Sequence, residues 1–541
     1  MTLKLDLESH EDPFKFRATY DEVNSVLNSE KFPTPDNDIV LKSQSKVTIV
    51  GGGLSGLTCA ITCKNELKED DVTIFDKYSK FGGTWFTSIY PGCACDVPAV
   101  WYSFSAELNS NWSQLTPRQY EIEEYITEVV KKLELDRHAK FRTEVVESRY
   151  NEELGEWIVH GINLDTGQRL EHKTKILVIS QGGLVYPNHL KAAKLGDFEG
   201  EYLHSALWNY DVDLKGKDIV VVGNGCSASQ IIPQVLEHYD PKSIVQIFRS
   251  KQYYLPPLPE VAHTVYKLFS GTRAGILFVR WFIATVAELK YPQYSGGGGF
   301  LSRLIRWLST REAINYMERT CPSKYHDMII PHYKIGCKGL VFDYKYLPSL
   351  HDQRISLVDI GIDHIEANHV VLASGEKLHA DVIVACTGYD LNKSYSKVPI
   401  YGINGISIKE LWEEEGPSAY ETILIKRCPN LFVFGGPNSS PAHSSLLSGV
   451  ENSCALFKKF ATKILSGELK SICVKDSKYD EWNFETQRVL RNHVLGTSYG
   501  GCGSWYTGDQ NRNNYSYPYS QIYYWWRMKY PKWDDFILEK N

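Results

Sequence analysis

Two glycine-rich loops in this chain have the residue types and spacing that bind the pyrophosphate of a dinucleotide. They occupy residues 51–56 and 223–228, so their first glycines stand 172 positions apart. Each loop follows a short run of apolar, β-branched residues and precedes an apolar stretch, which is the strand–turn–helix context that such a loop requires. The free N–H groups and the positive end of the helix would hold the phosphates. Two loops therefore predict two dinucleotides.

The first loop, GGGLSG, matches the pattern GxGxxG. Gly51 permits the tight turn, Gly53 lets the pyrophosphate approach the backbone, and Gly56 lets the helix pack closely against the strand. The next expected strand ends in Asp76, 23 positions after Gly53, near the spacing of a carboxylate that binds a ribose hydroxyl. We favour nucleotide binding over the alternative, a plain glycine turn. The residues expected to bind this nucleotide are Gly51, Gly53, Ser55, Gly56 and Asp76.

The second loop, GNGCSA, is a GxGxxA variant in which alanine takes the place of the third glycine. The strand expected after it, at residues 243–248, is followed by Arg249 and Ser250 instead of an acid. A carboxylate there would repel a 2′-phosphate, whereas an arginine accommodates one. This loop is thus predicted to prefer NADPH to NADH, and a plain surface arginine is the alternative. The residues expected to bind NADPH are Gly223, Gly225, Ser227, Ala228, Arg249 and Ser250.

The elements that position these loops indicate an α/β fold with two Rossmann-like dinucleotide-binding domains. Residues 1–44 are expected to form an N-terminal extension, either helical or loosely docked. Residues 45–200 begin the first domain and residues 201–380 form the second. Residues 381–541 are expected to return to the first domain, which would make it discontinuous. Apolar helical stretches interrupt the strand pattern of the second domain at residues 253–328, where we expect a helical insertion.

Composition excludes several classes of protein. Charged residues make up 23% of the 541 residues and the net charge is −6, so nothing favours a nucleic-acid partner. The N-terminus lacks the apolar core of a signal peptide, which favours a cytoplasmic protein. The most apolar stretch, residues 274–287, is 14 residues long and contains Arg280, so no stable membrane span is expected. We expect a helix there that lines a substrate cavity, and contact with a membrane surface is the alternative.

The 12 cysteines do not form any C-x-x-C pair, which argues against a disulfide reductase. Cys93 and Cys95 are too close for ordinary zinc-ligand spacing, so we expect no metal site. Reduced thiols in a cytosolic enzyme are the expected state.

Three further stretches carry residues at fixed spacings. Residues 82–96 read GGTWFTSIYPGCACD, residues 198–208 read FEGEYLHSALW, and residues 381–388 read DVIVACTG. In type and order they resemble the fingerprints of the class B flavoprotein monooxygenases, and within that class those of the Baeyer–Villiger monooxygenases. One position departs, because Asn209 stands where Pro or Asp is usual. The aromatic tail, residues 515–536, is similar to that of fungal members.

The resemblance implies a chemistry for the two loops. FAD would occupy the first loop and NADPH the second. NADPH would reduce FAD, O₂ would add to give a flavin C4a-peroxide, and one oxygen atom would enter a small organic substrate. The aromatic and apolar content of the insertion favours a hydrophobic substrate. The oligomeric state is left open.

The resemblance also assigns roles to single residues. Asp96 would lie near the flavin and orient an active-site arginine, and Trp505 would contact the nicotinamide cofactor. These two are the candidate catalytic residues. His204 and Trp208 would couple the two domains. The cofactor-binding residues that the matching motifs add are Gly83, Thr84, Trp85, Asp96, Lys338, Thr387 and Gly388.

One departure from the family bears on the chemistry. Where the resemblance leads us to expect an arginine after Lys338, this chain has Gly339. A guanidinium would stabilise an anionic peroxide and the oxyanion that forms when it attacks a ketone. Without that arginine, Asp96 would have a raised pKa. Candidates to replace it are Arg118, Arg249 and Arg354.

Three alternatives to ketone oxidation follow from Gly339. A protonated peroxide needs no arginine to give its oxygen to nitrogen or sulfur, so an N- or S-oxygenating flavin monooxygenase is the first. The second is an NADPH oxidase or a non-oxygenating flavoprotein. The third is a catalytically silent flavoprotein that binds a partner, against which the intact nucleotide loops argue.

Overall fold

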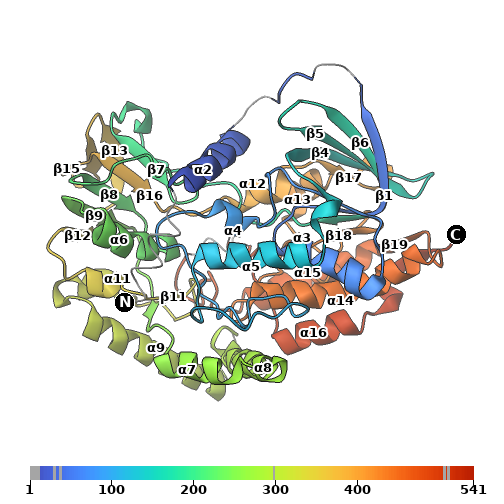
Figure 1. Ribbon diagram of the computed structural model, residues 1–541. Helices are drawn as coiled ribbons and strands as arrows, with labels where there is room; N and C mark the ends of the chain where they lie inside the picture. Colours follow the sequence, from blue (N-terminus) through green and yellow to red (C-terminus); the bar gives the residue numbers. More distant parts are fainter. Residues whose placement is uncertain (1–12, 29–31, 36–38, 296–298, 504–506, 508–511) are drawn as a thin grey trace.

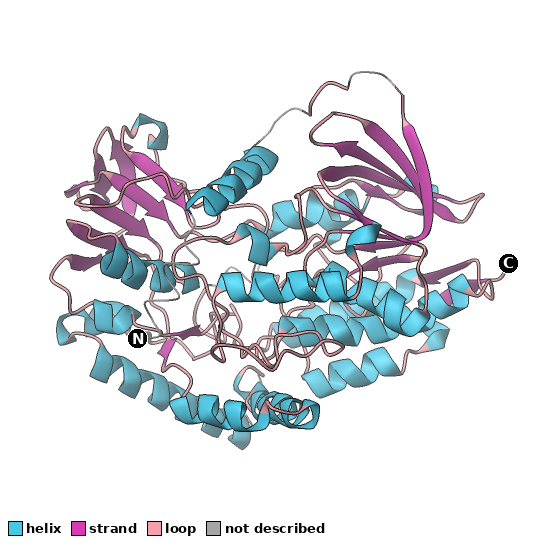
Figure 2. Cartoon of the chain, viewed as in Figure 1, coloured by secondary structure: helices cyan, strands magenta, loops and turns pink. Residues whose placement is uncertain are grey.

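The fold is built around two large β-sheets that lie on opposite sides of the molecule (Figure 1). The structure is a computed structural model that describes residues 13–28, 32–35, 39–295, 299–503, 507 and 512–541. Helices fill the space between and below the sheets (Figure 2). Over the described residues these helices are α2 (Pro13–Asn28), α3 (Leu54–Thr62), α4 (Thr84–Thr87), α5 (Gln119–Lys132), α6 (Cys226–His238), α7 (Glu260–Phe269), α8 (Arg273–Leu289), α9 (Phe300–Thr320), α10 (His326–Ile329), α11 (Tyr346–Ser349), α12 (Leu391–Ser396), α13 (Ile408–Glu415), α14 (Leu446–Leu465), α15 (Asp476–Leu490) and α16 (Gln521–Lys529).

The first sheet has the order β17-β4-β5-β6-β1-β2-β3, with β18 beside β6, within the described residues. Its strands are β1 (Leu41–Val50), β2 (Val72–Phe75), β3 (Ala139–Lys140), β4 (Thr143–Asn151), β5 (Glu156–Asn163), β6 (Arg169–Ile179), β17 (Ile400–Tyr401) and β18 (Leu431–Val433). β1 runs parallel to β2 and β6, whereas β4, β5 and β6 are antiparallel. Because β17 and β18 come from late in the chain, the chain returns to this sheet after leaving it.

The second sheet is parallel and has the order β12-β9-β8-β16-β7. Its strands are β7 (Glu201–His204), β8 (Asp218–Val222), β9 (Ser243–Ile247), β12 (Ile355–Val358) and β16 (Val382–Ala385). Three shorter antiparallel strands follow β12, namely β13 (Ile362–Glu366), β14 (His369–Leu372) and β15 (Lys377–His379). Since β16 pairs with β7 and β8, the start of the segment expected to return to the first domain still belongs to the second sheet.

Each glycine loop joins a central strand to a helix, because α3 follows β1 and α6 follows β8. The branched apolar residues of β8 are buried in the second sheet, as their run in the sequence predicts. The predicted α/β fold with Rossmann-like nucleotide-binding units is therefore confirmed.

Residues 253–328, where an insertion is expected, consist mainly of α7, α8 and α9, and β10 (Tyr254–Leu255) pairs with β11 (Val341–Phe342) beside them. None of the described helices combines the length and the apolar character needed to cross a bilayer. The expectation that residues 274–287 line a substrate cavity is not met in either cavity described below. Half of α8 faces outward instead, and Trp281 is 72% exposed.

The aromatic tail docks through large apolar side chains, as expected. Tyr517 stacks on Tyr524 with a centroid distance of 4.1 Å, and both rings are buried together with Met528. α16 packs against α14, and β20 (Phe536–Glu539) pairs with β19 (Ser471–Val474). The tail therefore belongs to the core beside the first sheet.

The chain crosses between the sheets twice, and the two crossings lie side by side. Asn188, in the first crossing, donates its backbone N–H to Gly388 O at 2.9 Å, and Thr387 Oγ1 donates to Asn188 O at 2.5 Å. The fingerprint at residues 198–208 meets the motif at residues 381–388 here, since β7 and β16 are paired. A Cβ at Gly200 would lie 2.4 Å from Asp381 O, so this close approach explains the glycine of the fingerprint.

The N-terminal extension contains a docked helix, α2, that contacts both halves of the molecule. Phe16 stacks on Tyr210, beside the second sheet, with a centroid distance of 4.9 Å. Glu22 accepts hydrogen bonds from Ser79 N at 2.5 Å and Ser79 Oγ at 2.6 Å, just after β2 of the first sheet. Val23 is buried against the same side.

A disulfide joins Cys337 to Cys502, with a Cα–Cα distance of 6.2 Å. This corrects the expectation that all cysteines are reduced thiols, and the other ten are free. The pair is 165 residues apart, so only the fold brings the two thiols together.

Candidate functional site

The first glycine loop has the geometry that its sequence predicts. Gly51 has a φ of +109°, which favours glycine, and a Cβ at Gly56 would lie 1.9 Å from Gly51 O. A Cβ at Gly53 would meet only Gly83 Cα at 3.5 Å and Gly83 N at 4.0 Å. The turn and the helix packing thus require Gly51 and Gly56, whereas the space in front of Gly53 is left open for a ligand.

Asp76 lies at the end of β2 with its carboxylate against the first loop. It accepts hydrogen bonds from Gly52 N at 2.5 Å and Tyr78 N at 2.8 Å. Burial raises the pKa of Asp76, and these two N–H groups oppose the shift. Each carboxylate oxygen has more than one acceptor site, so Asp76 can still accept from a ribose hydroxyl.

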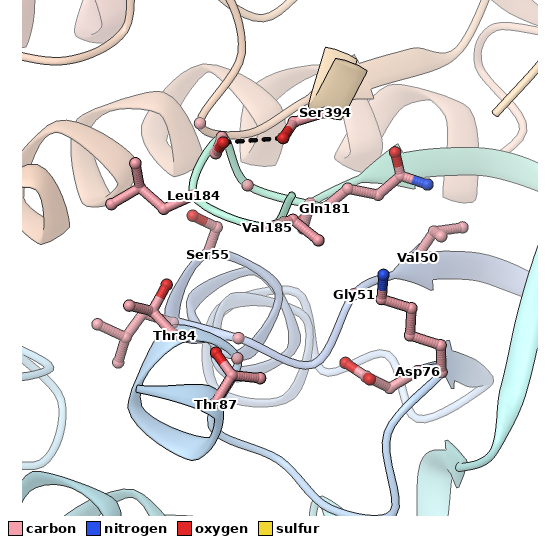
Figure 3. Close-up of a pocket in the computed structure, with 18 of the residues that line it drawn as sticks. Val50, Gly51, Ser55, Asp76, Thr84, Thr87, Gln181, Leu184, Val185 and Ser394 are labelled. Carbon is pink, nitrogen blue, oxygen red and sulfur yellow. Dashed lines mark hydrogen bonds between the residues drawn. The ribbon is translucent and has the colours of Figure 1, made fainter. Parts of the chain in front are cut away.

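The first cavity opens beside this loop (Figure 3). Of the residues expected to bind the first nucleotide or the flavin, those that line it are Gly51, Gly53, Ser55, Asp76, Gly83, Thr84 and Trp85. Gly56 is not in the lining, because its role is to pack the helix. In Figure 3, Ser394 donates to Gly183 O at 2.9 Å across the far wall. That hydrogen bond joins two segments of the cavity wall that are far apart in sequence.

Sequence reasoning missed several residues of this cavity. Lys77 follows Asp76 directly, and its ammonium lies 4.9 Å from the ring centroid of Tyr186. Burial lowers the pKa of Lys77 to about 8. The sequence signal that could have identified Lys77 is its position directly after Asp76, at the end of β2. Ser394, Ser439 and Tyr515 come from distant segments, for which the sequence offered no signal.

The second loop is open where a pyrophosphate would approach. No atom of the described residues lies within 4 Å of a Cβ built on Gly225, whereas a Cβ on Gly223 would lie 2.4 Å from Cys386 O. Gly223 has a φ of +120°, and Ala228 is fully buried at the packing position. Ser227 lies in the first turn of α6, whose N–H groups face the same opening.

The residues expected to bind a 2′-phosphate come together, although 88 positions separate them. Lys338 Nζ donates to Ser250 Oγ at 2.5 Å. Burial lowers the pKa of Lys338, and the positive charge of Arg249 lowers it further. Two neighbouring cations without a carboxylate partner in these contacts suit an anion with more than one negative charge.

Asp96 lies between the two nucleotide sites. Its charge raises the pKa of Cys226, at the start of α6, and that of Tyr102, in the lining of the first cavity; in both cases burial is the larger cause. Asp96 keeps an accessible surface, but the protein atoms crowded around it still desolvate its carboxyl and raise its pKa, as expected for an aspartate without its arginine.

None of the three candidate arginines is paired with Asp96. Arg118 donates to Gly92 O at 2.8 Å, and Arg354 pairs with Asp352 at 2.9 Å and with Asp240 at 3.1 Å. Arg249 lies beside Lys338. Among the described residues, no arginine lowers the pKa of Asp96.

The remaining candidate residues have different outcomes. Gly339 is half-buried, and its carbonyl accepts a hydrogen bond from Gln252 Nε2. Thr387 and Gly388 lie at the crossing between the sheets and do not line the first cavity. Trp505 lies outside the described residues.

Residues of the fingerprint at 82–96 also contact the second nucleotide unit. Tyr90 donates to Gln230 Oε1 at 2.9 Å, and Gln230 Nε2 donates to Ala94 O at 3.2 Å. A Cβ at Gly92 would lie 2.6 Å from Gln230 O. A second cavity lies beside these contacts, between residues 89–94 and α6. The fingerprint thus docks α6 against the first sheet's unit and sets the distance between the two loops.

The chain is similar in sequence to known monooxygenases. It is 31% identical to a Baeyer–Villiger monooxygenase from Pseudomonas aeruginosa over 89% of this chain and 88% of that protein. It is 27% identical to an FAD-binding monooxygenase from Aspergillus niger over 92% of this chain and 82% of that protein. Residues 49–116 match the model of an NAD(P)-binding Rossmann-like domain, and residues 107–267 match that of the L-lysine 6-monooxygenase/L-ornithine 5-monooxygenase family.

The fold is similar to solved structures as well. An oxidized steroid monooxygenase bound to NADP superposes with a TM-score of 0.77 at 22% identity, over 92% of this chain and 100% of that one. A cyclohexanone monooxygenase from Rhodococcus sp. Phi1 bound to NADP⁺ gives a TM-score of 0.76 at 20% identity, over the same shares. These likenesses concern the fold.

Proposed function

The chain belongs to the Baeyer–Villiger monooxygenase family and is a flavin- and NADPH-dependent monooxygenase; from that premise we propose which residues hold each cofactor and which substrates the enzyme takes. The observation that carries the proposal is the position of Asp96 between two nucleotide loops that belong to different sheets. An arrangement of this kind suits two cofactors that react with each other beside one carboxyl group.

FAD is assigned to the first cavity, and when bound it supplies hydride acceptance and activation of O₂. The opening at Gly53 and the N-terminus of α3 fit its pyrophosphate. Asp76 accepts a hydrogen bond from a ribose hydroxyl, and Trp85 packs against the flavin end of the site. Ser394 and Gly183 keep water from entering through the wall.

NADPH is assigned to the second loop. Gly225 and the N-terminus of α6 would hold the pyrophosphate, since no described side chain lies within 4 Å of a Cβ built on Gly225. Arg249, Ser250 and Lys338 bind the 2′-phosphate. The family resemblance assigns contact with the nicotinamide to Trp505, which lies outside the described residues.

The domain assignment follows from the sheets. We assign residues 45–200, together with the chain after β16, to FAD binding and residues 201–385 to NADPH binding. Residues 253–328 form the helical insertion of the second domain. A cytoplasmic location is part of the proposal.

The substrate is an organic molecule with an apolar body and, as the family name indicates, a ketone. The raised pKa of Asp96 lets its carboxyl hold a proton and donate it to the substrate oxygen. A second candidate is a sulfide or an amine, because position 339 lacks the guanidinium that would stabilise an oxyanion.

The test combines cofactor content with oxygen stoichiometry. Purified protein should contain FAD and should consume O₂ and NADPH in equal amounts when a suitable substrate is present. Ester formed from a ketone supports the first candidate, and sulfoxide without ester supports the second. Protein that binds no FAD, or that oxidises NADPH without O₂, would refute the assignment.

A further inference from the structure

The outward sides of four helices carry large apolar side chains at helical spacing. On α8 the exposed large apolar residues are Phe278, Trp281, Phe282, Val286 and Leu289; positions 278, 282, 286 and 289 follow one another at intervals of three or four along one side. α7, α9 and α16 carry stripes of the same kind; Leu268 on α7 is 77% exposed and Phe300 on α9 is 76% exposed. These helices thus also carry apolar side chains on the outward side, which is polar in an ordinary surface helix. We refer to these four stripes as the apolar face.

The four helices form one continuous edge of the molecule, along the bottom of Figure 1. α8 joins α16 directly, because Glu288 accepts hydrogen bonds from Gln521 N at 3.1 Å and Ile522 N at 3.2 Å. The rings of Phe269 and Phe278 lie 5.4 Å apart and join α7 to α8. Apolar patches that extend over several helices mark interaction surfaces.

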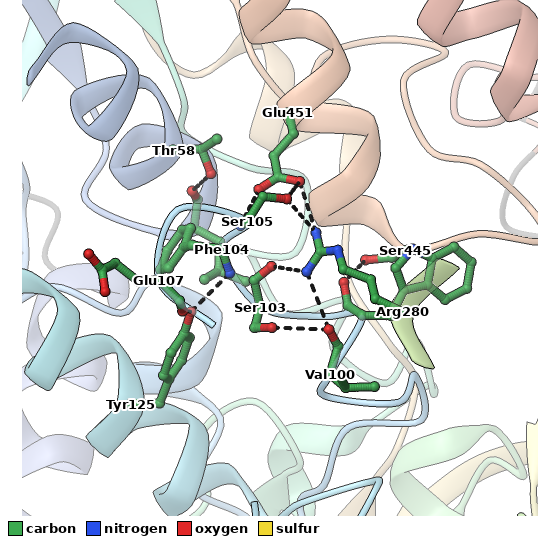
Figure 4. Close-up of polar contacts among 12 residues, drawn as sticks. Thr58, Val100, Ser103, Phe104, Ser105, Glu107, Tyr125, Arg280, Ser445 and Glu451 are labelled. Carbon is green, nitrogen blue, oxygen red and sulfur yellow. Dashed lines mark hydrogen bonds and ion pairs between the residues drawn. The ribbon is translucent and has the colours of Figure 1, made fainter. Parts of the chain in front are cut away.

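A buried polar anchor fixes the direction in which α8 faces. Arg280, on the inner side of the helix, donates to Ser103 O at 2.8 Å and Val100 O at 3.3 Å and pairs with Glu451 at 2.9 Å (Figure 4). Breaking this ion pair would leave the buried Arg280 guanidinium without its acidic partner. Trp281 and Phe282 therefore cannot turn inward while this anchor holds.

The charges at the border of the apolar face are mainly positive. Exposed acids on the four helices are Glu260, Glu312 and Glu318. The exposed basic residues are Lys267, Arg273, Arg303, Arg311, Arg319 and Lys529. The exposed charged residues of these helices therefore sum to a positive charge, although the net charge of the whole chain is −6.

Cations also lie against aromatic rings at this border. Lys529 Nζ lies 4.8 Å from the ring centroid of Trp525. The guanidinium carbon of Arg311 lies 5.4 Å from the ring centroid of Trp307. Tryptophan beside lysine or arginine is the combination found where a helix lies at the boundary between lipid headgroups and acyl chains.

We propose that the apolar face docks on the surface of a membrane that contains anionic lipids. The aromatic and aliphatic side chains enter the boundary of the acyl chains, and the surrounding Lys and Arg side chains contact the negative headgroups. A second copy of the chain fits less well, because a twofold interface sets the same patch against itself and would bring the positive borders together. Contact is with the surface only, since no described helix can span a bilayer.

The experiment measures co-sedimentation of the FAD-loaded enzyme with vesicles. Phosphatidylcholine vesicles that contain phosphatidylglycerol should bind the enzyme, pure phosphatidylcholine vesicles should bind it more weakly, and added salt should reduce binding to the anionic vesicles. The variants Leu268→Glu and Trp281→Glu should each lower partitioning by about tenfold or more, since each replaces an inserted apolar side chain by an anion.

The matched control is Leu154→Glu, the same substitution at a leucine that is 53% exposed in the turn between β4 and β5, away from these helices (Figure 1). It should leave vesicle binding unchanged. FAD content and NADPH oxidation should be normal in all variants, which shows that they fold. Absence of binding by the unmodified enzyme would overturn the proposal, as would binding that Leu268→Glu and Trp281→Glu leave intact. A dimer in sedimentation velocity that these variants dissociate, without vesicle binding, would assign the face to a second copy instead.

Discussion

His204 Nε2 lies 3.2 Å from Thr387 Oγ1, and this contact joins the two fingerprints at the crossing between the sheets. His204 Nδ1 accepts the backbone N–H of Ala206 at 3.0 Å, so the proton of the neutral ring lies on Nε2 and is donated to Thr387. Thr387 in turn donates to Asn188 O at 2.5 Å. One chain of hydrogen bonds therefore runs from the strand of the second sheet through both crossings.

Removing the threonine hydroxyl should weaken this chain. Thr387→Val is expected to lower the free energy of unfolding by about 1 kcal/mol, because two hydrogen bonds are lost while the shape is retained. Urea unfolding measures the change. Thr462→Val is the matched control, since the hydroxyl of this exposed residue donates to Lys458 O within its own helix. Equal losses in the two variants would contradict a special role for Thr387.

The protonation of His204 should make the protein sensitive to acid. Burial and the neighbouring His189 lower the pKa of His204 to about 4, below the usual value of about 6.5. The unfolded chain therefore binds the proton more readily, so stability is complete above about pH 6.5 and falls as the pH drops towards 4. His204→Gln keeps the donor to Thr387 and should flatten this part of the curve in urea unfolding. His172 and His493 have pKa values lowered to about 4 by burial as well, so some slope should remain.

Specificity for NADPH should depend on the cation pair at the second loop. Arg249→Ala and Lys338→Ala should each raise the KM for NADPH by about 10- to 100-fold, because each removes charge-assisted hydrogen bonds to the 2′-phosphate. The KM for NADH, which lacks that phosphate, should change little. Arg354→Ala is the control, since Arg354 precedes β12 and pairs with Asp352 and Asp240 at the opposite end of the strands from Arg249. An equal rise in the KM for NADPH and for NADH would show that Arg249 and Lys338 do not bind the 2′-phosphate.

The two loops should respond differently to an added methyl group. Gly56→Ala places a Cβ 1.9 Å from Gly51 O and should cost about 1–3 kcal/mol of stability together with FAD content. The methyl group of Gly225→Ala meets no atom within 4 Å in the described part of the chain, so the enzyme should fold and bind FAD normally. Its KM for NADPH should nevertheless rise by roughly tenfold or more, because the methyl group occupies the place of the pyrophosphate. Absorbance of bound flavin and steady-state kinetics separate the two effects.

Restoring an arginine at position 339 should change the preferred substrate. Gly339→Arg should raise ester formation from ketones by about 10²-fold, because a guanidinium near Asp96 would stabilise the oxyanion of the attacked carbonyl. Sulfide oxidation should change little. Gly361→Arg, at an open position of the second sheet's edge, is the matched control and should alter neither rate. Equal gains for ketones and sulfides would show that the substitution acts through something other than the oxyanion.

Local patterns predicted the parts of the site that are continuous in sequence. The strand–glycine–helix units around Gly51 and Gly223 are confirmed because a tight turn and a close helix contact each demand a residue without a side chain. The acid at Asp76 and the basic residue at Arg249 follow from where parallel strands end. The same rules left Lys77 unnoticed, since its depressed pKa arises from burial that only the folded chain produces.

Long-range features could not be read from spacing. The disulfide between Cys337 and Cys502 depends on two loops that meet after 165 residues. The periodicity of α8 identified a helix but not which side is buried, because apolar residues lie all round it and the position of Arg280 decides the matter. For a similar reason the return to the first domain was predicted to begin before β16, although β16 belongs to the second sheet. A buried strand has the same sequence pattern in either sheet.

The short helix before β1 has a consequence for motion. α2 contacts Tyr210 of the second nucleotide unit through Phe16 and Ser79 of the first unit through Glu22, so it bridges the two units. Any motion that moves the two units apart has to break either the stacking of Phe16 on Tyr210 or the hydrogen bonds of Glu22 to Ser79, and the strength of these contacts opposes the motion. α2 thereby helps to decide how readily the oxidised coenzyme can leave.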